Sequence, residues 1–494
     1  MAKIECNTRK WITGALYGCV LVLAGCGGGG GSAPLPSPPP APPPASLPPS
    51  STLANQCTLD TERRFVRSVF DEIYLWYRDV PAVTATSFTS TYDYFEALKT
   101  PLKTASGSPV DKFSFAVTQA EWDLREAAAE VSHGVKWQAD NAARAIVALD
   151  VEANSAAGRA GVQRGWKITA VNGVPLNQLT AALANTAVFA PAAGTTTNFT
   201  LVNRAGTQVS LALRADRVDY SLVPETRVLT TPQGPVGYLV LRFWGDNAQN
   251  DLAAAIKTMS QSKVRDLVLD LRYNEGGSAL PVLQLAYMVA GERVRDKVLL
   301  RIRANDKRPG LARDEQALAF KVDPATERIL LDQPLPALNL SRVFVLTTED
   351  TCSASELLIN GLKPYVDVIQ IGATTCGKPY GFNGVSNCGK FYAPMELSAT
   401  NAASQGHYSD GIDARCVARD DVSRDLGDAS ETLLRTALDF ARTGSCPPAT
   451  TAVAQDANDL QPWLLLKRPQ DRARSSMKIG RPIAVQRSEQ PAQQ

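Results

Sequence analysis

The segment from residue 347 to residue 382 constrains the fold of this chain more than any other. A polar, turn-like run opens it, and a helical pattern that includes Leu358 and Leu362 follows until Pro364 ends it. The run 366–371 then has the apolar, β-branched composition of a buried strand. This alternation predicts a parallel α/β sheet, in which the carboxyl ends of neighbouring strands share one edge.

Two chemically suggestive residues lie at turns of this segment. Ser353 precedes the predicted helix, and Lys378 follows the predicted strand 25 positions later. Both turns fall at the same edge of a parallel sheet, so the two side chains can meet there. A serine hydroxyl needs a base, and a lysine serves as one if burial lowers its pKa enough to leave the amine neutral. The pair predicts a serine hydrolase; a helix cap and a solvated charge are the alternative.

The segment resembles the active-site region of the C-terminal processing, or tail-specific, serine proteases. Members of that family carry a Ser-Ala-Ser-Glu turn and, 25 positions after its first serine, the lysine of a Gly-Lys pair; both are present here. The resemblance implies that Ser353 is the nucleophile, Lys378 its general base and Glu356 an auxiliary group. One position differs, because Phe382 stands where many members have a glutamine that orients the lysine.

A second strand and turn follow the pattern of the same family. The run 266–272 is an almost continuous apolar strand of the parallel type, and it ends in the Tyr-Asn-Glu-Gly-Gly turn of residues 273–277. In the family this turn supplies one oxyanion donor, and the residue after the nucleophile supplies the other. The resemblance assigns the hole to Gly276 or Gly277 together with Ala354. The alternative is that the paired glycines only relieve a tight turn.

Residues 131 to about 220 resemble a PDZ domain. The resemblance rests on a short helical run at 154–157, on Gly161, and on the strand and Asn-Gly hairpin turn of residues 165–173. A PDZ domain binds an extended peptide as an added strand and holds its terminal carboxylate in a loop of backbone N–H groups. The peptide-binding residues implied here are His133, Gly134 and Val135. Lys136 replaces the second glycine of the usual loop, and a purely structural domain is the alternative.

The N-terminus has the pattern of a processing signal. Basic residues precede the short apolar run 12–23, and Leu-Ala-Gly-Cys at 23–26 matches a bacterial lipoprotein cleavage box. The box predicts cleavage before Cys26 and a lipid on its sulfur. The alternative, a short transmembrane anchor, needs a longer apolar run. We therefore expect a periplasmic, membrane-anchored lipoprotein, and Gly27 favours the outer membrane.

The rest of the chain divides into regions of different composition. The predicted parts are the signal at 1–25, a lipid-anchored Gly/Pro-rich linker at 26–56, a helical domain at 57–130, the PDZ-like domain at 131–220, the catalytic core at 221–447 and a loosely ordered tail at 448–494. With the resemblance, the expected fold is an α/β crotonase-like protease core with a mostly parallel sheet, a PDZ domain and an N-terminal helical domain.

Six cysteines follow the signal, and an even number in an exported chain favours disulfides. The expected pairs are Cys352–Cys376, Cys388–Cys416 and Cys57–Cys446. The first is expected because Cys352 and Cys376 flank the residues that should meet; two free thiols are the alternative. No Cys-x-x-Cys pair or histidine cluster indicates a metal, so we expect no metal and no cofactor.

The charge balance gives no reason to expect a nucleic-acid partner. Without the signal, 48 basic and 48 acidic residues remain. The sequence predicts a serine endopeptidase with a polypeptide substrate, presented by the PDZ domain as an unfolded or C-terminal segment. The alternatives are an inactive peptide-binding lipoprotein, a hydrolase of small esters or amides, and a Ser-His-Asp triad that uses His407 and Asp410.

Overall fold

The computed structural model describes residues 47–448, apart from 141–144, 190 and 324, together with residues 477 and 478. The predicted signal, Cys26 and most of the predicted linker lie outside the described residues. No helix in the described part is long and apolar enough to cross a bilayer.

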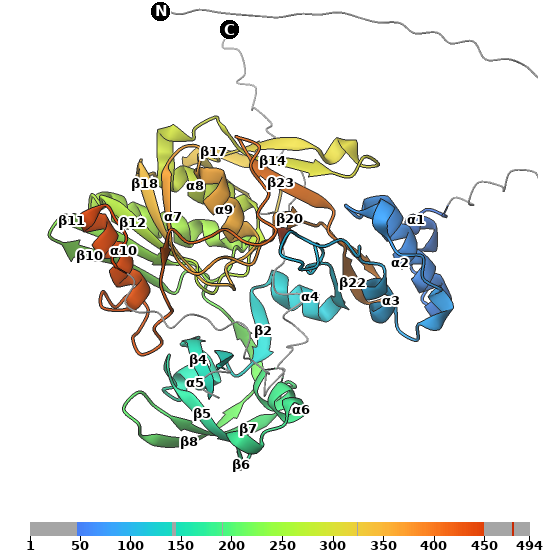
Figure 1. The fold of residues 1–494 in the computed structure, drawn as a ribbon, viewed down its shortest axis with the longest axis horizontal. Coiled ribbons are helices and arrows are strands. Elements are labelled where there is room, and N and C mark those ends of the chain that lie inside the picture. Colours follow the sequence, from blue (N-terminus) through green and yellow to red (C-terminus); the bar gives the residue numbers. More distant parts are fainter. Residues whose placement is uncertain (1–46, 141–144, 190, 324, 449–476, 479–494) are drawn as a thin grey trace, which may run out of the picture. The chain divides into compact units, whose positions relative to one another are not determined.

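A six-stranded sheet forms the centre of residues 221–447, the predicted catalytic core, which we call the catalytic region (Figure 1). Its strands, in spatial order, are β10 (Glu225–Thr231), β11 (Gly234–Val240), β12 (Asp266–Asp270), β18 (Arg342–Thr347), β19 (Asp367–Gly372) and β24 (Cys416–Val417). Strand β10 is antiparallel to β11, and all other neighbours are parallel. The central strands are apolar because both faces of the sheet are covered.

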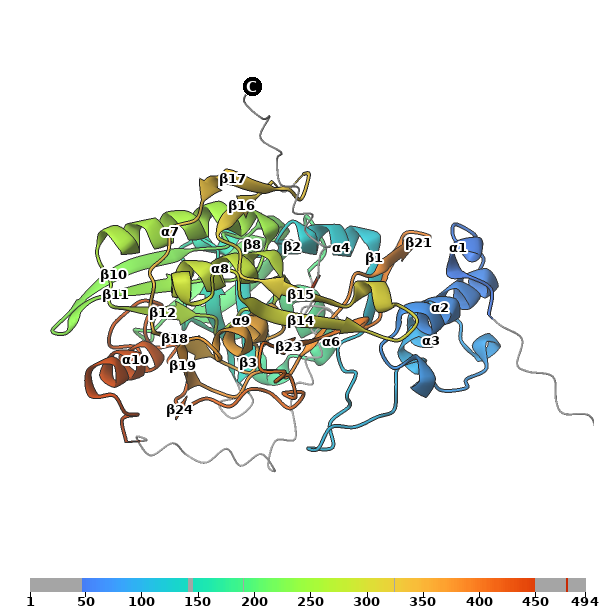
Figure 2. The same cartoon turned by 90° about the horizontal axis from the view of Figure 1, so that it is seen from above.

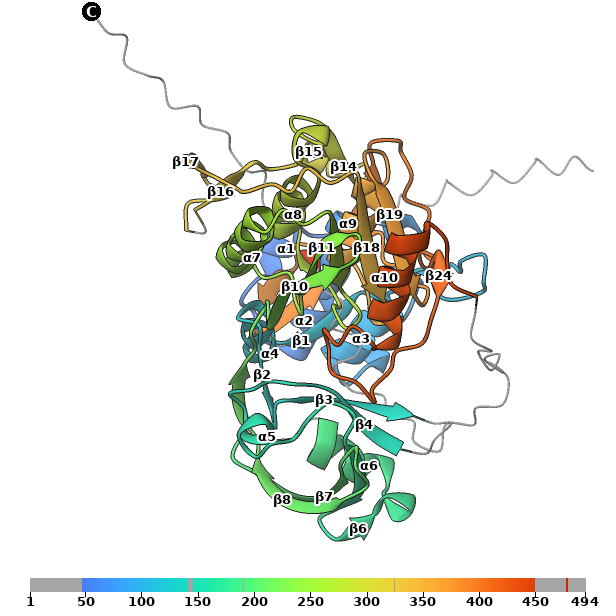
Figure 3. The same cartoon turned by 90° about the vertical axis from the view of Figure 1, so that its left-hand side faces the viewer.

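Helices cover the two faces of this sheet (Figure 3). They are α7 (Gln249–Gln261), α8 (Leu280–Ala290) and α9 (Ala354–Leu362) on one face and α10 (Thr432–Thr443) on the other. Side chains alternate accordingly: Leu267 and Leu269 pack toward α7 to α9, whereas Val268 packs with Leu433 of α10. The predicted α/β core with a mostly parallel sheet therefore agrees with the structure.

A smaller antiparallel sheet adjoins α9. Its strands, in spatial order, are β15 (Arg313–Gln316), β14 (Val298–Ala304), β23 (Leu397–Asn401) and β20 (Tyr380–Gly381). The hairpin of β16 (Phe320–Val322) and β17 (Ile329–Pro334) extends beyond it. Because β20 begins two residues after Lys378, its pairing with β23 fixes the chain that carries this lysine.

The N-terminal part packs on a hairpin of the catalytic region (Figure 2). Its elements are α1 (Ser50–Leu53), α2 (Leu59–Ile73), α3 (Thr91–Ala97), β1 (Phe115–Thr118) and α4 (Gln119–Glu126). The hairpin comprises β21 (Val385–Asn387) and β22 (Lys390–Ala393), and β1 pairs with β22. Helix α1 lies inside the region expected to be linker. It packs on the N-terminal part, because Leu53 is buried and Ser50 donates hydrogen bonds to Glu72.

Residues 129–219 form a module with its own core, which we call the β-module. Its strands are β2 (Ala129–Ser132), β3 (Val135–Asp140), β4 (Ala145–Val151), β5 (Lys167–Val171), β6 (Val174–Pro175), β7 (Thr196–Val202), β8 (Gln208–Arg214) and β9 (Asp216–Asp219), with the short helices α5 (Ala156–Arg159) and α6 (Ala181–Ala184). The main sheet has the order β3-β4-β5-β7-β8 around Ile146, Ile168 and Phe199. Asn172 and Gly173 both have positive φ in the β5–β6 turn, as the Asn-Gly pair predicts.

Three disulfides are present in the described part of the chain: Cys352–Cys376, Cys57–Cys388 and Cys416–Cys446. The expected pairs Cys388–Cys416 and Cys57–Cys446 are wrong. Cys57 lies beside the β21–β22 turn, where Asn55 N donates to Asn387 Oδ1. Cys446 follows α10, which covers the sheet face next to β24. The partners are therefore set by tertiary packing that the spacing does not show.

A two-residue strand of the predicted tail lies beside the predicted oxyanion turn. Strand β25 (Met477–Lys478) pairs in parallel with β13 (Gly277–Ser278), with Gly277 opposite Met477. Apart from these two residues and Pro448, the tail lies outside the described residues.

Candidate active site

Ser353 occupies a sharp turn between a central strand and a helix. Strand β18 ends at Thr347 and α9 begins at Ala354, so Ser353 is the residue immediately before the helix. Its φ of 58° and ψ of −112° lie in a region that L-residues rarely adopt. The side chain is buried, and Oγ has no hydrogen-bond partner among the described residues. A strained turn that presents an unengaged hydroxyl is the geometry expected of a nucleophile.

Lys378 is fully buried in an aromatic pocket. Its Nζ lies 5.5 Å from the ring centroids of both Phe113 and Phe382. In the described part of the chain, Nζ forms no hydrogen bond. Burial lowers the pKa of Lys378 to about 7, while the charges of Asp111 and Glu356 offset part of that effect. A neutral amine is therefore accessible near neutral pH.

Asp111 does not form an ion pair with Lys378, because other donors already engage it. Its Oδ2 accepts from Tyr74 Oη at 2.6 Å, and its Oδ1 accepts from the backbone N–H of Phe113 and Ser114. The N-terminal part of the chain thus supplies both a ring and a nearby, satisfied carboxylate to the lysine pocket. Sequence reasoning missed Asp111 and Phe113, which lie more than 200 positions before Lys378.

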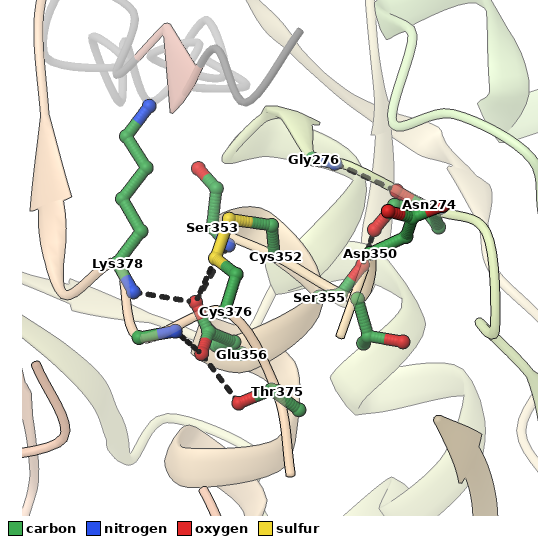
Figure 4. The surroundings of a disulfide bond; sticks show 12 residues. Asn274, Gly276, Asp350, Cys352, Ser353, Ser355, Glu356, Thr375, Cys376 and Lys378 are labelled. Atoms are coloured by element: carbon green, nitrogen blue, oxygen red, sulfur yellow. Dashed lines mark hydrogen bonds between the residues drawn. A yellow bond between two sulfur atoms is a disulfide. The ribbon is translucent and has the colours of Figure 1, made fainter. Parts of the chain in front are cut away.

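Glu356 connects the serine turn to the lysine loop (Figure 4). Its Oε2 accepts from the backbone N–H of Ser353 and of Lys378, each at 2.8 Å. Its Oε1 accepts from Thr375 Oγ1 at 2.5 Å and from Gly377 N at 2.8 Å. Glu356 accepts four hydrogen bonds and donates none, which is the pattern of an ionised carboxylate. Burial nevertheless raises the pKa of Glu356.

The side chains of Ser353 and Lys378 extend in the same direction from these tied turns (Figure 4). Because neither Oγ nor Nζ has a hydrogen-bond partner among the described residues, the two atoms are not hydrogen-bonded to each other. Catalytic hydrogen bonds are often long in an enzyme without substrate. Phe382, which occupies the position of the family glutamine, packs against Phe115 and Trp122 and contributes a ring to the lysine pocket instead of a hydrogen bond.

The glycine turn lies against the serine. A Cβ atom placed on Gly276 would be 2.7 Å from Ser353 Cβ and 3.1 Å from its Oγ, and Gly276 has a φ of +117°. Gly276 N already donates to Asn274 Oδ1 at 2.9 Å. Gly277 follows in β13, and Ala354 is the first residue of α9, where a backbone N–H has no partner within the helix. Gly276 and Ala354 therefore lie next to Ser353, whereas a Cβ atom on Gly277 would face Trp244.

A further contact joins the same two turns. Trp244 Nε1 donates to Ser355 Oγ at 2.9 Å, and Ser355 Oγ donates to Asn274 O at 3.2 Å. Cys352 N also donates to Asn274 O at 3.0 Å. The glycine turn and the serine turn are thus held together by direct hydrogen bonds, a role that sequence reasoning did not assign to Trp244.

The disulfide Cys352–Cys376 spans the two halves of the site (Figure 4). Cys352 immediately precedes Ser353, and Cys376 lies two residues before Lys378. The Cα atoms of the two cysteines are 5.2 Å apart. Both sulfur atoms lie near a carboxylate oxygen of Glu356. Because these sulfurs are bonded to each other, they are not thiolates and do not offer a metal the ligands of a cysteine site.

The predicted peptide-binding residues fall in different environments. His133 is buried against Phe199, without a hydrogen-bond partner for either ring nitrogen in the described chain, and burial lowers its pKa to about 4. Gly134 N donates to Ser132 Oγ. By contrast, Val135 lines a cavity of about 470 Å³, together with Lys136. His133 and Gly134 are therefore part of the core and the turn, whereas the next residues face the cavity.

His407 and Asp410 do not join the serine in the structure. His407 is exposed, and Asp410 accepts hydrogen bonds from Thr104 and Ser106 of the N-terminal part. The Ser-His-Asp alternative thus has no support from the geometry.

Comparisons with known proteins relate two regions of the chain to one peptidase family. Residues 235–386 match the model of Peptidase family S41, and residues 61–115 match that of the Peptidase S41 N-terminal domain. Carboxyl-terminal-processing peptidase 3, chloroplastic, of Arabidopsis thaliana is 25% identical over 243 residues, which is 47% of this chain and 42% of that protein. Carboxyl-terminal-processing peptidase 1, chloroplastic, of the same plant is 22% identical over 242 residues, 47% of this chain and 43% of that protein. The chain thus matches less than half the length of each relative.

A solved structure shows the same fold. The crystal structure of a putative S41 protease from Bacteroides fragilis matches with a TM-score of 0.61 and 23% identity, over 76% of this chain and 97% of that chain. The region that matches the family model contains both Ser353 and Lys378, and the solved structure shares the fold. More narrowly, residues 235–386 are similar to peptidase family S41, and residues 61–115 are similar to the N-terminal domain of that family.

Proposed function

We propose that this protein is an endopeptidase in which Ser353 is the nucleophile and Lys378 the general base. The observation that carries the proposal is the buried Lys378 amine, which lies in an aromatic pocket, has no ion pair among residues that the structure describes, and has a pKa lowered to about 7. A lysine kept for structure alone would pair with a carboxylate, because an unpaired buried charge is costly.

The proposed reaction follows from these groups. Ser353 Oγ attacks the scissile carbonyl while Lys378 Nζ accepts the hydroxyl proton. The resulting ammonium donates that proton to the leaving amine, and an acyl-enzyme remains. Water then attacks the ester, gives its proton to Nζ, and the new acid leaves as Ser353 regains a proton. The backbone N–H of Ala354 would face the oxyanion, together with that of Gly277 or with that of Gly276 once it has left Asn274 Oδ1.

A polypeptide is the substrate that the surroundings favour. Strand β13 contains Gly277 and already accepts an extended segment of this chain, since β25 pairs with it in parallel. The cavity at the β-module adds apolar walls from Trp137 and Phe189. We infer that the β-module acts as a PDZ domain and presents an unfolded or C-terminal segment to the site.

The sequence pattern at the N-terminus supports a lipid anchor at Cys26 and a periplasmic position at the outer membrane. Replacing Cys26 with alanine is expected to leave the chain without lipid label and to move it from the membrane fraction to the soluble one. Retention of both label and membrane association by this variant would contradict the anchor.

The catalytic proposal is tested by cleavage of a disordered polypeptide with an internal fluorescence reporter. Wild type is expected to cleave it, and the variants Ser353→Ala and Lys378→Met are expected to be inactive while remaining folded. Ser409→Ala serves as the control, because Ser409 Oγ pairs with Tyr380 Oη rather than with the reacting groups. If wild type and Ser353→Ala cleave equally, or neither cleaves, an inactive peptide-binding protein becomes the better account. Turnover of esters without peptide cleavage would instead favour a small-molecule hydrolase.

A further inference from the structure

Lys136 extends from the β-module to the loops that carry the candidate active site. Its Nζ lies 2.9 Å from Glu275 Oε1 and 3.1 Å from Asp350 Oδ2, and it also donates to Tyr273 O at 3.3 Å. The side chain is 16% exposed, and those of Glu275 and Asp350 are 19% and 39% exposed. One ammonium therefore joins two carboxylates and a carbonyl of the catalytic region.

The partners of Lys136 belong to two different loops. Glu275 immediately precedes Gly276 in the glycine turn, and Asp350 lies three residues before Ser353. These loops position the proposed oxyanion donors and the proposed nucleophile. A cation that bridges their carboxylates opposes the mutual repulsion of these groups and sets the spacing between the loops.

A second cation of the β-module holds the same glycine turn. Arg164 is buried, donates to Tyr273 Oη, and forms an ion pair with Asp420. Lys136 Nζ and the Arg164 guanidinium carbon lie 5.5 Å and 5.6 Å from the Tyr273 ring centroid. Arg164 thus fixes the side chain of Tyr273, while Lys136 contacts the backbone and the next carboxylate of the turn.

We propose that Lys136 is a positioning residue for catalysis: by bridging Glu275 and Asp350, it holds the glycine turn and the serine turn in their reactive arrangement. This inference rests on the proposed peptidase function and adds a part of the machinery that lies outside the catalytic region. It also accounts for the sequence, because a lysine at this position replaces the glycine of the usual PDZ loop and its ammonium pairs with Glu275 and Asp350 of the neighbouring region.

The energies favour a catalytic role over a folding role. The pair with Asp350 is partly exposed and contributes little to folding stability, whereas loss of the cation beside the mostly buried Glu275 carboxylate lowers stability to some extent. A displacement of about 1 Å in a catalytic group can by contrast cost on the order of 100-fold in rate. Removing the charge is therefore expected to leave a folded protein with impaired turnover.

The test uses Lys136→Met, which keeps the length of the side chain and removes its charge, and Lys136→Arg, which retains a cation. Arg204→Met is the matched control, because Arg204 is also a β-module cation that pairs with the catalytic region, at Asp425, but it touches neither loop. We expect kcat to fall about 100-fold in Lys136→Met with KM changed less, partial recovery in Lys136→Arg, and near wild-type values in Arg204→Met. Equal kcat in Lys136→Met and wild type would overturn the proposal.

A double variant tests whether Lys136 acts through Glu275. If it does, adding Glu275→Gln to Lys136→Met causes much less than the product of the two single losses. Strictly multiplicative losses would contradict a shared route.

Hydrogen exchange separates this proposal from the peptidase function itself. Lys136→Met is expected to raise amide exchange in residues 273–277 and 350–353, and Arg204→Met is not. This readout needs no turnover, so it also decides the positioning role if wild type fails to cleave any polypeptide. Unchanged exchange in both loops would refute the bridge even in an active enzyme.

Discussion

The backbone N–H groups of Ser353 and Lys378 donate to one and the same atom, Glu356 Oε2, each at 2.8 Å. Two residues 25 positions apart are thereby held at a single carboxylate, below side chains that extend in the same direction (Figure 4). The disulfide Cys352–Cys376 adds a covalent link between the same two turns. Backbone hydrogen bonds thus hold the two residues of the proposed dyad together, while their reacting side chains form no hydrogen bond to one another.

The first prediction concerns Glu356→Gln. An amide must turn its NH₂ group toward one pair of the four donors, so two hydrogen bonds are lost and two donors oppose it. We expect destabilisation of about 1–3 kcal/mol and a large drop in kcat/KM, measured by thermal unfolding and peptide cleavage. Glu349→Gln, an exposed residue of the preceding loop, is expected to change neither. Wild-type activity in Glu356→Gln would show that the carboxylate does not organise the site.

The second prediction concerns Gly276→Ala. The added Cβ would lie 2.7 Å from Ser353 Cβ, and the residue would have to keep a φ of +117°. We expect kcat/KM to fall by at least about 100-fold, because the nucleophile must move. Gly206→Ala provides the control, since Gly206 also has positive φ but has no atom within 4 Å of the new Cβ. Similar activity in the two variants would argue against a close packing of the glycine turn on the serine.

How far the sequence leads can be judged from particular residues. The Ser353–Lys378 spacing and the apolar runs of β12 and β19 are local signals, so they predict the turns at one edge of a parallel sheet. Phe113 could not be predicted to line the lysine pocket, because that contact depends on how the N-terminal part packs against the β21–β22 hairpin. The same dependence explains why Cys57 was assigned the wrong partner.

Lys136 shows a different limit. Its departure from the PDZ pattern is visible in the sequence, but a departure does not name a partner. The structure is needed to show that the Lys136 ammonium forms ion pairs with Glu275 and Asp350.

The third prediction compares the disulfides Cys352–Cys376 and Cys57–Cys388 by their effects on activity and on stability. Replacing Cys352 and Cys376 by serine is expected to lower kcat/KM about tenfold or more, because the turns of the dyad lose their covalent link. Replacing Cys57 and Cys388 is expected to leave kcat/KM of the folded enzyme near wild type. The latter pair closes a loop of 331 positions against 24, so the chain-entropy model predicts the larger loss of stability for it. Thermal unfolding and peptide cleavage are measured on both double variants. The account is contradicted if the same variant shows both the larger loss of stability and the larger loss of kcat/KM.

The fourth prediction is a gain of stability on loss of activity. Lys378→Met removes a buried amine that has no hydrogen-bond partner in the described part of the chain, and it is expected to raise the free energy of unfolding by about 1–3 kcal/mol near neutral pH. The pKa of Lys378 is lowered from 10.5 to about 7, so between these values the unfolded chain binds a proton that the folded chain does not. Wild-type stability therefore rises with pH in this window, and the advantage of the methionine variant shrinks there.

Denaturant unfolding at about pH 6 and about pH 9.5 checks this prediction. Lys257→Met, at an exposed position of α7, serves as the control and is expected to change stability little. A destabilised Lys378→Met protein would mean that the amine has a structural partner in solution.

The central claim is that a neutral Lys378 accepts the proton of Ser353, and the pH dependence of kcat/KM for a disordered polypeptide tests it most directly. Below a pKa of about 7 the amine is protonated and cannot act as a base, so kcat/KM is expected to rise tenfold per pH unit and to level off above this value. A profile that shows no titration near pH 7 and rises only as an ordinary lysine loses its proton would contradict the account.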